Sequence, residues 1–110
     1  MDAAPGQLWR LYRGDELLAD LVVNDADFPW LYAAVRPYDG FAGVAPLFAE
    51  ELRLLEDGDD NSDAWEKAYA AIRSTVELRY PAGGHVPEFL LHIEDDRAWW
   101  RWSDEPFEAE

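Results

Sequence analysis

The chain has 110 residues, of which 49% are hydrophobic and 15% aromatic, so it is long enough to bury one core. Asp and Glu number 24 against nine Lys and Arg, and the resulting formal charge of −15 opposes binding to nucleic acids and to anionic lipid. The chain has no cysteine, which excludes disulfides, thiolate nucleophiles and cysteine-ligated metals.

Neither a signal-peptide pattern nor an apolar stretch approaching the ~20 residues of a membrane span is present in the sequence. We therefore expect a soluble, cytoplasmic protein with a single domain over residues 1–110. Residues 1–6 and 104–110 are expected to form flexible ends.

Residues 7–13 and 16–24 predict a first β-hairpin, because Gly14 is the first residue of the loop between them and suits a type II′ turn. In the predicted register Arg13 faces Glu16. One face then collects Leu8, Tyr12, Leu17, Ala19, Leu21 and Val23, and the other carries Trp9, Leu11, Leu18 and Val22.

Residues 24–30 have the composition of a helix start, with Asn and Asp as candidate N-caps and Pro29 in the first turn. This pattern predicts a short helix over 29–35, which Pro37 and Asp39-Gly40 would end.

Apolar residues recur with helical spacing from Phe41 to Leu55, so we expect a helix that begins near Ala45 with Pro46 in its first turn. Its predicted polar face contains Glu50, Glu51, Arg53 and Glu56.

Residues 57–63 form an acidic connector that partly resembles an EF-hand loop. It has Ser62 where the turn Gly belongs and Ala68 where the bidentate Glu belongs, which argues against a dedicated calcium site. The next helix is expected from Asn61 or Ser62 to Ser74, with an apolar stripe of Trp65, Ala68, Tyr69 and Ile72.

Residues 75–80 alternate as a strand, residues 81–84 form a turn, and a closing hairpin follows around Asp95-Asp96. The period-2 pattern selects a register in which the core face contains Phe89, Leu91, Ile93, Ala98, Trp100 and Trp102. The second face carries Leu90, His92, Trp99 and Arg101.

Strands thus cluster at both ends of the chain, with helices between them, in the order β-β-α-α-α-β-β-β. The pattern predicts an α+β fold with a mostly antiparallel sheet of about five strands and helices packed on one face.

No catalytic motif is present. His85, Glu88, His92 and Glu94 offer metal-ligand side chains, but strand geometry would not bring all four together without a bulge. The serines lie outside any nucleophile elbow, and Gly83-Gly84 precedes a strand and not a phosphate-binding helix. We therefore expect no metal and no cofactor, and the sequence points away from an enzyme.

Six tryptophans remain the most informative feature. Leu90, His92, Trp99 and Arg101 combine residue types common at binding hot spots on a face that the core does not need. Our hypothesis is a protein-interaction domain whose partner has a basic or apolar surface, and a homodimer is possible.

Two alternatives stay open. One is a small-molecule binder or enzyme with a pocket between sheet and helices, where Trp30, Tyr32, His92 and Arg101 would converge. The other is a nucleic-acid mimic, whose carboxylates would repeat with phosphate-like spacing.

Overall fold

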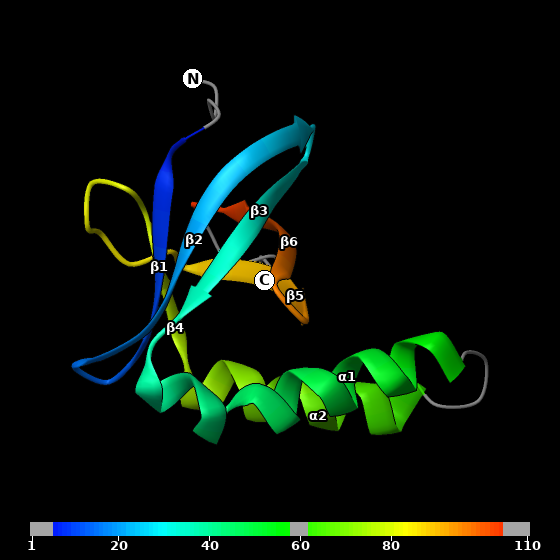
Figure 1. Ribbon diagram of the computed structural model, residues 1–110. Coiled ribbons are helices and arrows are strands. Elements are labelled where there is room, and N and C mark those ends of the chain that lie inside the picture. The colour runs from blue at the N-terminus through cyan, green and yellow to red at the C-terminus, as the bar shows by residue number, and fades with distance from the viewer. Residues whose placement is uncertain (1–5, 58–61, 105–110) are drawn as a thin grey trace.

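The computed structural model of the chain describes residues 6–57 and 62–104 (Figure 1). The elements, in chain order, are β1 (Leu8–Arg13), β2 (Glu16–Asp27), β3 (Trp30–Pro37), the 3-10 helix η1 (Asp39–Gly43), α1 (Ala45–Asp57), α2 (Ser62–Thr75), β4 (Glu77–Arg79), β5 (Glu88–Glu94) and β6 (Arg97–Ser103).

All of these strands pair antiparallel in one six-stranded sheet with the order β4-β1-β2-β3-β6-β5. The sheet curls until it is nearly a barrel, and α1 and α2 lie next to each other below it in the view of Figure 1. The predicted α+β class with a mostly antiparallel sheet is confirmed.

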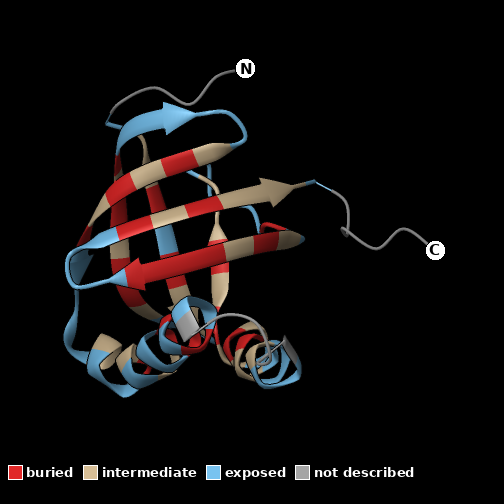
Figure 2. Ribbon diagram, turned by 90° about the vertical axis from the view of Figure 1, so that its right-hand side faces the viewer, coloured by how far each residue is buried: buried red, intermediate tan, exposed pale blue. Residues whose placement is uncertain are grey.

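The closing hairpin has the predicted register. Ile93 pairs with Ala98, Leu91 with Trp100 and Phe89 with Trp102. Asp95, the first turn residue, takes a positive φ of 56°, a conformation that Asp adopts more readily than most residues. In this register one face of the hairpin is buried, as Figure 2 shows along both strands, whereas Leu90 and Trp99 on the other face are only partly buried.

The first hairpin follows its predicted register only beside the turn. Tyr12 pairs with Leu17 as expected, but Leu11 pairs with Ala19, so Leu18 is an extra residue that forms a β-bulge. Beyond the bulge the faces are exchanged. The core therefore takes Trp9 and Leu11 from β1, and the prediction that Leu8 and Tyr12 share a face with Leu21 and Val23 is wrong.

The predicted helix over 29–35 is also wrong, because these residues belong to β3. The Asn, Asp and Pro residues that resembled a helix cap instead form the end of β2 and the turn into β3, which contains a cis Phe28-Pro29 bond. Leu31, Ala33 and Val35 are buried at alternate positions, which is the period of a strand.

Helix α1 begins at Ala45 with Pro46 in its first turn, as predicted, and α2 matches its predicted range within one residue. Helices α1 and α2 add Phe48, Tyr69 and Ile72 to the core of the sheet, and Val44, between η1 and α1, lies in the same core. The partial EF-hand loop falls largely on residues 58–61, which lie outside the described residues. In the described ranges, no helix is long and apolar enough to cross a membrane.

The two ends of the sheet meet different neighbours. The outer edge of β4 pairs with residues 84–86, where Arg79 forms a bridge with His85 and the Val86 N–H donates to the Leu78 carbonyl at 2.9 Å, while the outer edge of β5 faces α2. There the Tyr69 hydroxyl accepts a hydrogen bond from the Leu91 N–H at 2.9 Å and donates one to the Phe89 carbonyl at 2.7 Å. A helix side chain thus occupies backbone groups that an edge strand would otherwise leave unpaired.

Most of the predicted flexible ends, residues 1–5 and 105–110, fall outside the described residues. Gly6 donates a backbone hydrogen bond to Val23 at 2.6 Å, so this residue is joined to β2. The core also links segments far apart in sequence, since the Trp9 ring lies 5.5 Å from that of Trp100 and 5.1 Å from that of Trp102.

Candidate binding face

The sheet brings the four predicted binding residues together. His92 pairs with Trp99 and Leu90 pairs with Arg101 across β5 and β6, on the side of the hairpin opposite Trp100. Leu90, Trp99 and Arg101 are partly exposed, whereas His92 is only 4% exposed. The surface that a partner could touch therefore consists of the first three residues, and His92 lies beneath it.

Strand β3 extends this surface. Tyr32 pairs with Trp99, and Trp30, two residues earlier, lies on the same side with its ring 6.1 Å from that of His92. Trp30 and Tyr32 are both partly exposed. We call the surface formed by Trp30, Tyr32, Leu90, Trp99 and Arg101 the aromatic face.

His92 supports the aromatic face from below. Its ring lies 5.5 Å from Trp99 at an interplanar angle of 39°, in addition to its stacked contact with Trp30. One imidazole thus contacts indoles from two different strands. Removing this ring would take a packing partner from both tryptophans.

Below His92 lies a fully buried carboxylate, Glu51 of α1. His92 Nδ1 is 3.0 Å from the Glu51 carboxylate oxygens, and the Trp65 indole N–H donates to Glu51 Oε2 at 2.7 Å. A buried carboxylate is stable only when hydrogen-bonded or paired, and these two partners satisfy that requirement. The two helices are thereby connected to the sheet through a polar contact.

The prediction that Glu51 belongs to the polar face of α1 is therefore wrong. The spacing of the sequence does indicate a buried position, because Glu51 follows Phe48 by three residues and Val44 by seven. This is the spacing of the apolar stripe of the helix. A charged residue at a core position predicts a buried partner, which here is His92.

A small cavity of about 220 Å³ adjoins Trp99. It lies beside the second bulge of β2, where Asn24 is the extra residue between Val23 and Asp25. Its lining comprises Asn24, Tyr32, Ala33, Arg97, Ala98 and Trp99. The aromatic face therefore has a recess into which a partner side chain could insert.

The four residues with metal-ligand side chains do not converge on one point. His85 contacts Glu77 at 3.1 Å, Glu88 contacts Arg73 at 3.4 Å and Glu94 contacts Arg97 at 3.6 Å. His92 is engaged by Glu51. Each of the four thus has a different partner, and no group of three or more potential ligands occurs in residues 6–57 and 62–104.

Comparisons with known proteins return no matching family model, no matching curated protein and no matching solved structure.

Proposed function

We propose that the protein is a non-enzymatic interaction domain that docks a partner protein through its aromatic face. The proposal rests on one observation: three partly exposed aromatic residues from neighbouring strands lie together beside a recess. They are Trp30, Tyr32 and Trp99. Tryptophan, tyrosine and arginine are the residues most enriched at binding hot spots, and such anchors work best next to pockets.

We propose that the protein acts in the cytoplasm, because a chain without cysteine does not need an oxidising compartment in order to fold. The charge of −15 favours a partner with a basic surface, because complementary potentials accelerate encounter. Arg101 at the edge of the aromatic face adds a group that can bind a partner carboxylate or stack on a partner ring.

The test is affinity capture from the native host with a face variant, Trp99→Ala/Arg101→Ala, next to the unmodified protein. We expect a stoichiometric partner that the face variant loses. Leu55→Ala is the matched control, since Leu55 is a large apolar residue that is 47% exposed but lies on α1 and is not part of the aromatic face. It should retain the partner.

Light scattering on the purified protein completes the test. A concentration-dependent dimer that Trp99→Ala dissociates would identify the partner as a second copy. A protein that is monomeric at micromolar concentration and captures no stoichiometric partner would contradict the proposal.

The buried Glu51–His92 pair favours one second candidate, a small-molecule site. The Glu51 carboxylate lies 3.0 Å from His92 Nδ1 and fixes the orientation of the imidazole ring, as carboxylates do for the histidine bases of enzymes. Titration with a fragment library, followed by NMR of the His92 ring, would test this candidate. Fragments that shift His92 in the native protein and not in Glu51→Gln would support it.

A further inference from the structure

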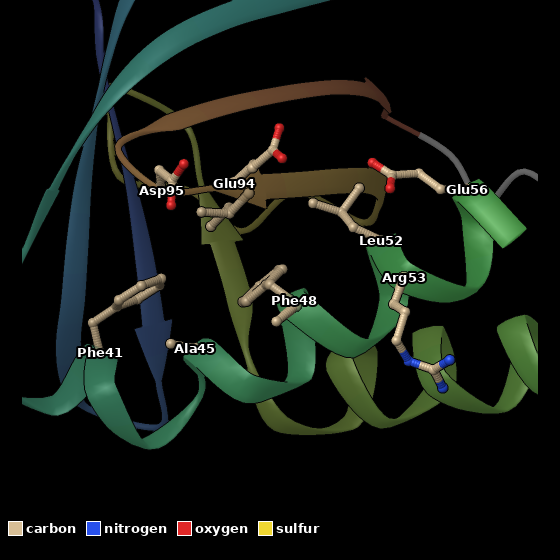
Figure 3. Close-up of a pocket in the computed structure, with 10 residues that line it drawn as sticks. Phe41, Ala45, Phe48, Leu52, Arg53, Glu56, Glu94 and Asp95 are labelled. Atoms are coloured by element: carbon tan, nitrogen blue, oxygen red, sulfur yellow. The ribbon is translucent and has the colours of Figure 1, made fainter.

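A groove runs between α1 and the β5–β6 turn, with a volume of about 450 Å³ (Figure 3). From α1 it is lined by Ala45, Phe48, Ala49, Leu52, Arg53 and Glu56, residues spaced three, four or one apart, which is one face of the helix over about three turns. Phe41, Ile93, Glu94 and Asp95 complete the lining. We call it the α1 groove.

The base of the α1 groove is apolar. Phe48, Leu52 and Ile93 are buried below it, and Phe41 and Ala45 are partly exposed at its wall. Ala49 is exposed, and because its side chain is a single methyl group, an incoming group can approach the helix closely. Such a base suits methylene groups better than a hydrated ion.

The rim of the α1 groove is acidic. Glu56, Glu94 and Asp95 are all exposed, and Figure 3 shows Glu94 and Asp95 on the strand side and Glu56 at the far end. The Arg53 guanidinium is directed away from these carboxylates and contacts Glu50 at 2.7 Å. Glu94 contacts Arg97 at 3.6 Å, but both side chains are largely exposed and such pairs are weak.

We propose that the α1 groove binds a segment of a partner protein in which Lys or Arg residues alternate with apolar ones. Long cationic side chains lay their methylenes on an apolar surface and keep the charged head in contact with carboxylates. A second copy of this chain is disfavoured as occupant, because two molecules of charge −15 repel each other. The proposal does not depend on the aromatic face.

The test uses synthetic peptides of about 12 residues, which are long enough to span the three turns of α1 that line the groove. A labelled peptide of Leu and Lys is titrated with the full-length protein by fluorescence anisotropy, in parallel with the same peptide carrying Glu in place of Lys. We expect saturable binding of the Lys peptide and none of the Glu peptide.

The groove variant is Glu56→Gln/Glu94→Gln/Asp95→Asn, in which Asn preserves the positive φ required at position 95. The control, Asp27→Asn/Asp63→Asn/Glu66→Gln, makes the same change in net charge at exposed positions outside the groove. We expect the groove variant to bind at least about tenfold more weakly and the control to change by less than about threefold, since general screening affects both variants alike.

A second variant, Ala49→Arg, supplies a cation within the groove itself and should abolish peptide binding while circular dichroism remains unchanged. Equal losses in the groove and control variants would overturn the proposal, as would equal binding of the Glu peptide. Complete displacement of the peptide by a polyamine at similar concentration would show that only the charge is recognised, and would also overturn it. Trp99→Ala should leave peptide affinity unchanged, so failure here is distinguishable from failure of the aromatic face.

Discussion

Glu51 illustrates how one residue joins three elements of this protein. Its carboxylate is fully buried in α1, accepts a hydrogen bond from Trp65 of α2 and contacts His92 of β5. Replacing an entire buried pair by apolar residues can be harmless, but removing one member leaves the other without compensation. The loss of stability on substitution therefore depends on whether the other member of the pair stays buried without a partner.

We predict that Glu51→Ala lowers the free energy of unfolding by roughly 3–5 kcal/mol, the usual cost of breaking a buried pair. Urea denaturation followed by tryptophan fluorescence measures this change. Glu50→Ala is the control, because Glu50 is the adjacent residue and its carboxylate forms an exposed ion pair with Arg53 at 2.7 Å. If both substitutions moved the urea midpoint equally, Glu51 would not have the role assigned to it.

Two neighbouring tryptophans of the closing hairpin have different roles. Trp100 is fully buried against Trp9, whereas Trp99 is partly exposed on the aromatic face. Trp100→Ala should cost about 3–5 kcal/mol, and Trp99→Ala clearly less, because only the first opens a cavity in the core. Thermal unfolding of both variants measures the difference. Equal destabilisation would mean that the hairpin is buried on both sides.

For single residues, the sequence is informative where the backbone is a regular strand. Leu90, His92, Trp99 and Arg101 were placed on one face because each step along a strand reverses the side chain. Glu51 and Trp65 were missed, since their contact joins residues 14 apart on two helices whose packing no local pattern encodes. Trp30 and Tyr32 reached the face through a strand that composition had suggested was a helix.

At the scale of elements, α2 protects the edge strand β5 through Tyr69. Burial raises the pKa of the Tyr69 hydroxyl well above its ordinary value of 10.0. Burial and the hydrogen bond to Asp104 raise the pKa of Tyr80 to about 12. Both groups stay protonated in the folded protein at a pH where the unfolded chain already ionises.

The folded protein should therefore lose stability at alkaline pH. The stability contributed by these tyrosines is fully present below pH 10 and is lost as the pH rises from 10 towards their folded pKa values, because the unfolded state binds fewer protons there. Urea midpoints measured between pH 8 and about 11.5 should therefore decrease above pH 10.

Tyr69→Phe isolates the larger contributor. It removes both hydrogen bonds to β5 and should cost about 1–3 kcal/mol at neutral pH, since the Leu91 N–H and Phe89 carbonyl lose their partner. The decrease above pH 10 should also become shallower. An unchanged alkaline slope in Tyr69→Phe would show that other groups cause it.

Helices and strands are predictable from the sequence where their apolar residues recur with a regular period. Both long helices and the closing hairpin follow clear periods. The first hairpin could not be placed correctly beyond its turn, because Leu17, Leu18 and Ala19 are all apolar and hide which one is the bulge. Strand β3 was misassigned because caps and turns use the same Asn, Asp and Pro residues.

For the molecule as a whole, net charge opposes compactness. The formal charge of −15 is distributed over 110 residues, and exposed ion pairs such as Arg13–Glu16 and Arg53–Glu50 offset little of that repulsion. Raising NaCl from 10 to 100 mM shortens the screening length from about 30 to about 10 Å. The melting temperature should therefore rise by several degrees, and KCl should act equally. A decrease would mean that attractive pairs dominate.

The contact of Trp9 with Trp100 and Trp102 also determines when the protein can fold during synthesis. Strands β1 to β3 leave the ribosome first and can form a meander by local pairing, but the aromatic partners of β1 are made almost a whole chain later. Contacts of such wide sequence separation slow folding and expose apolar surface in the meantime. The nascent chain therefore remains without a completed core until β6 has emerged from the ribosome.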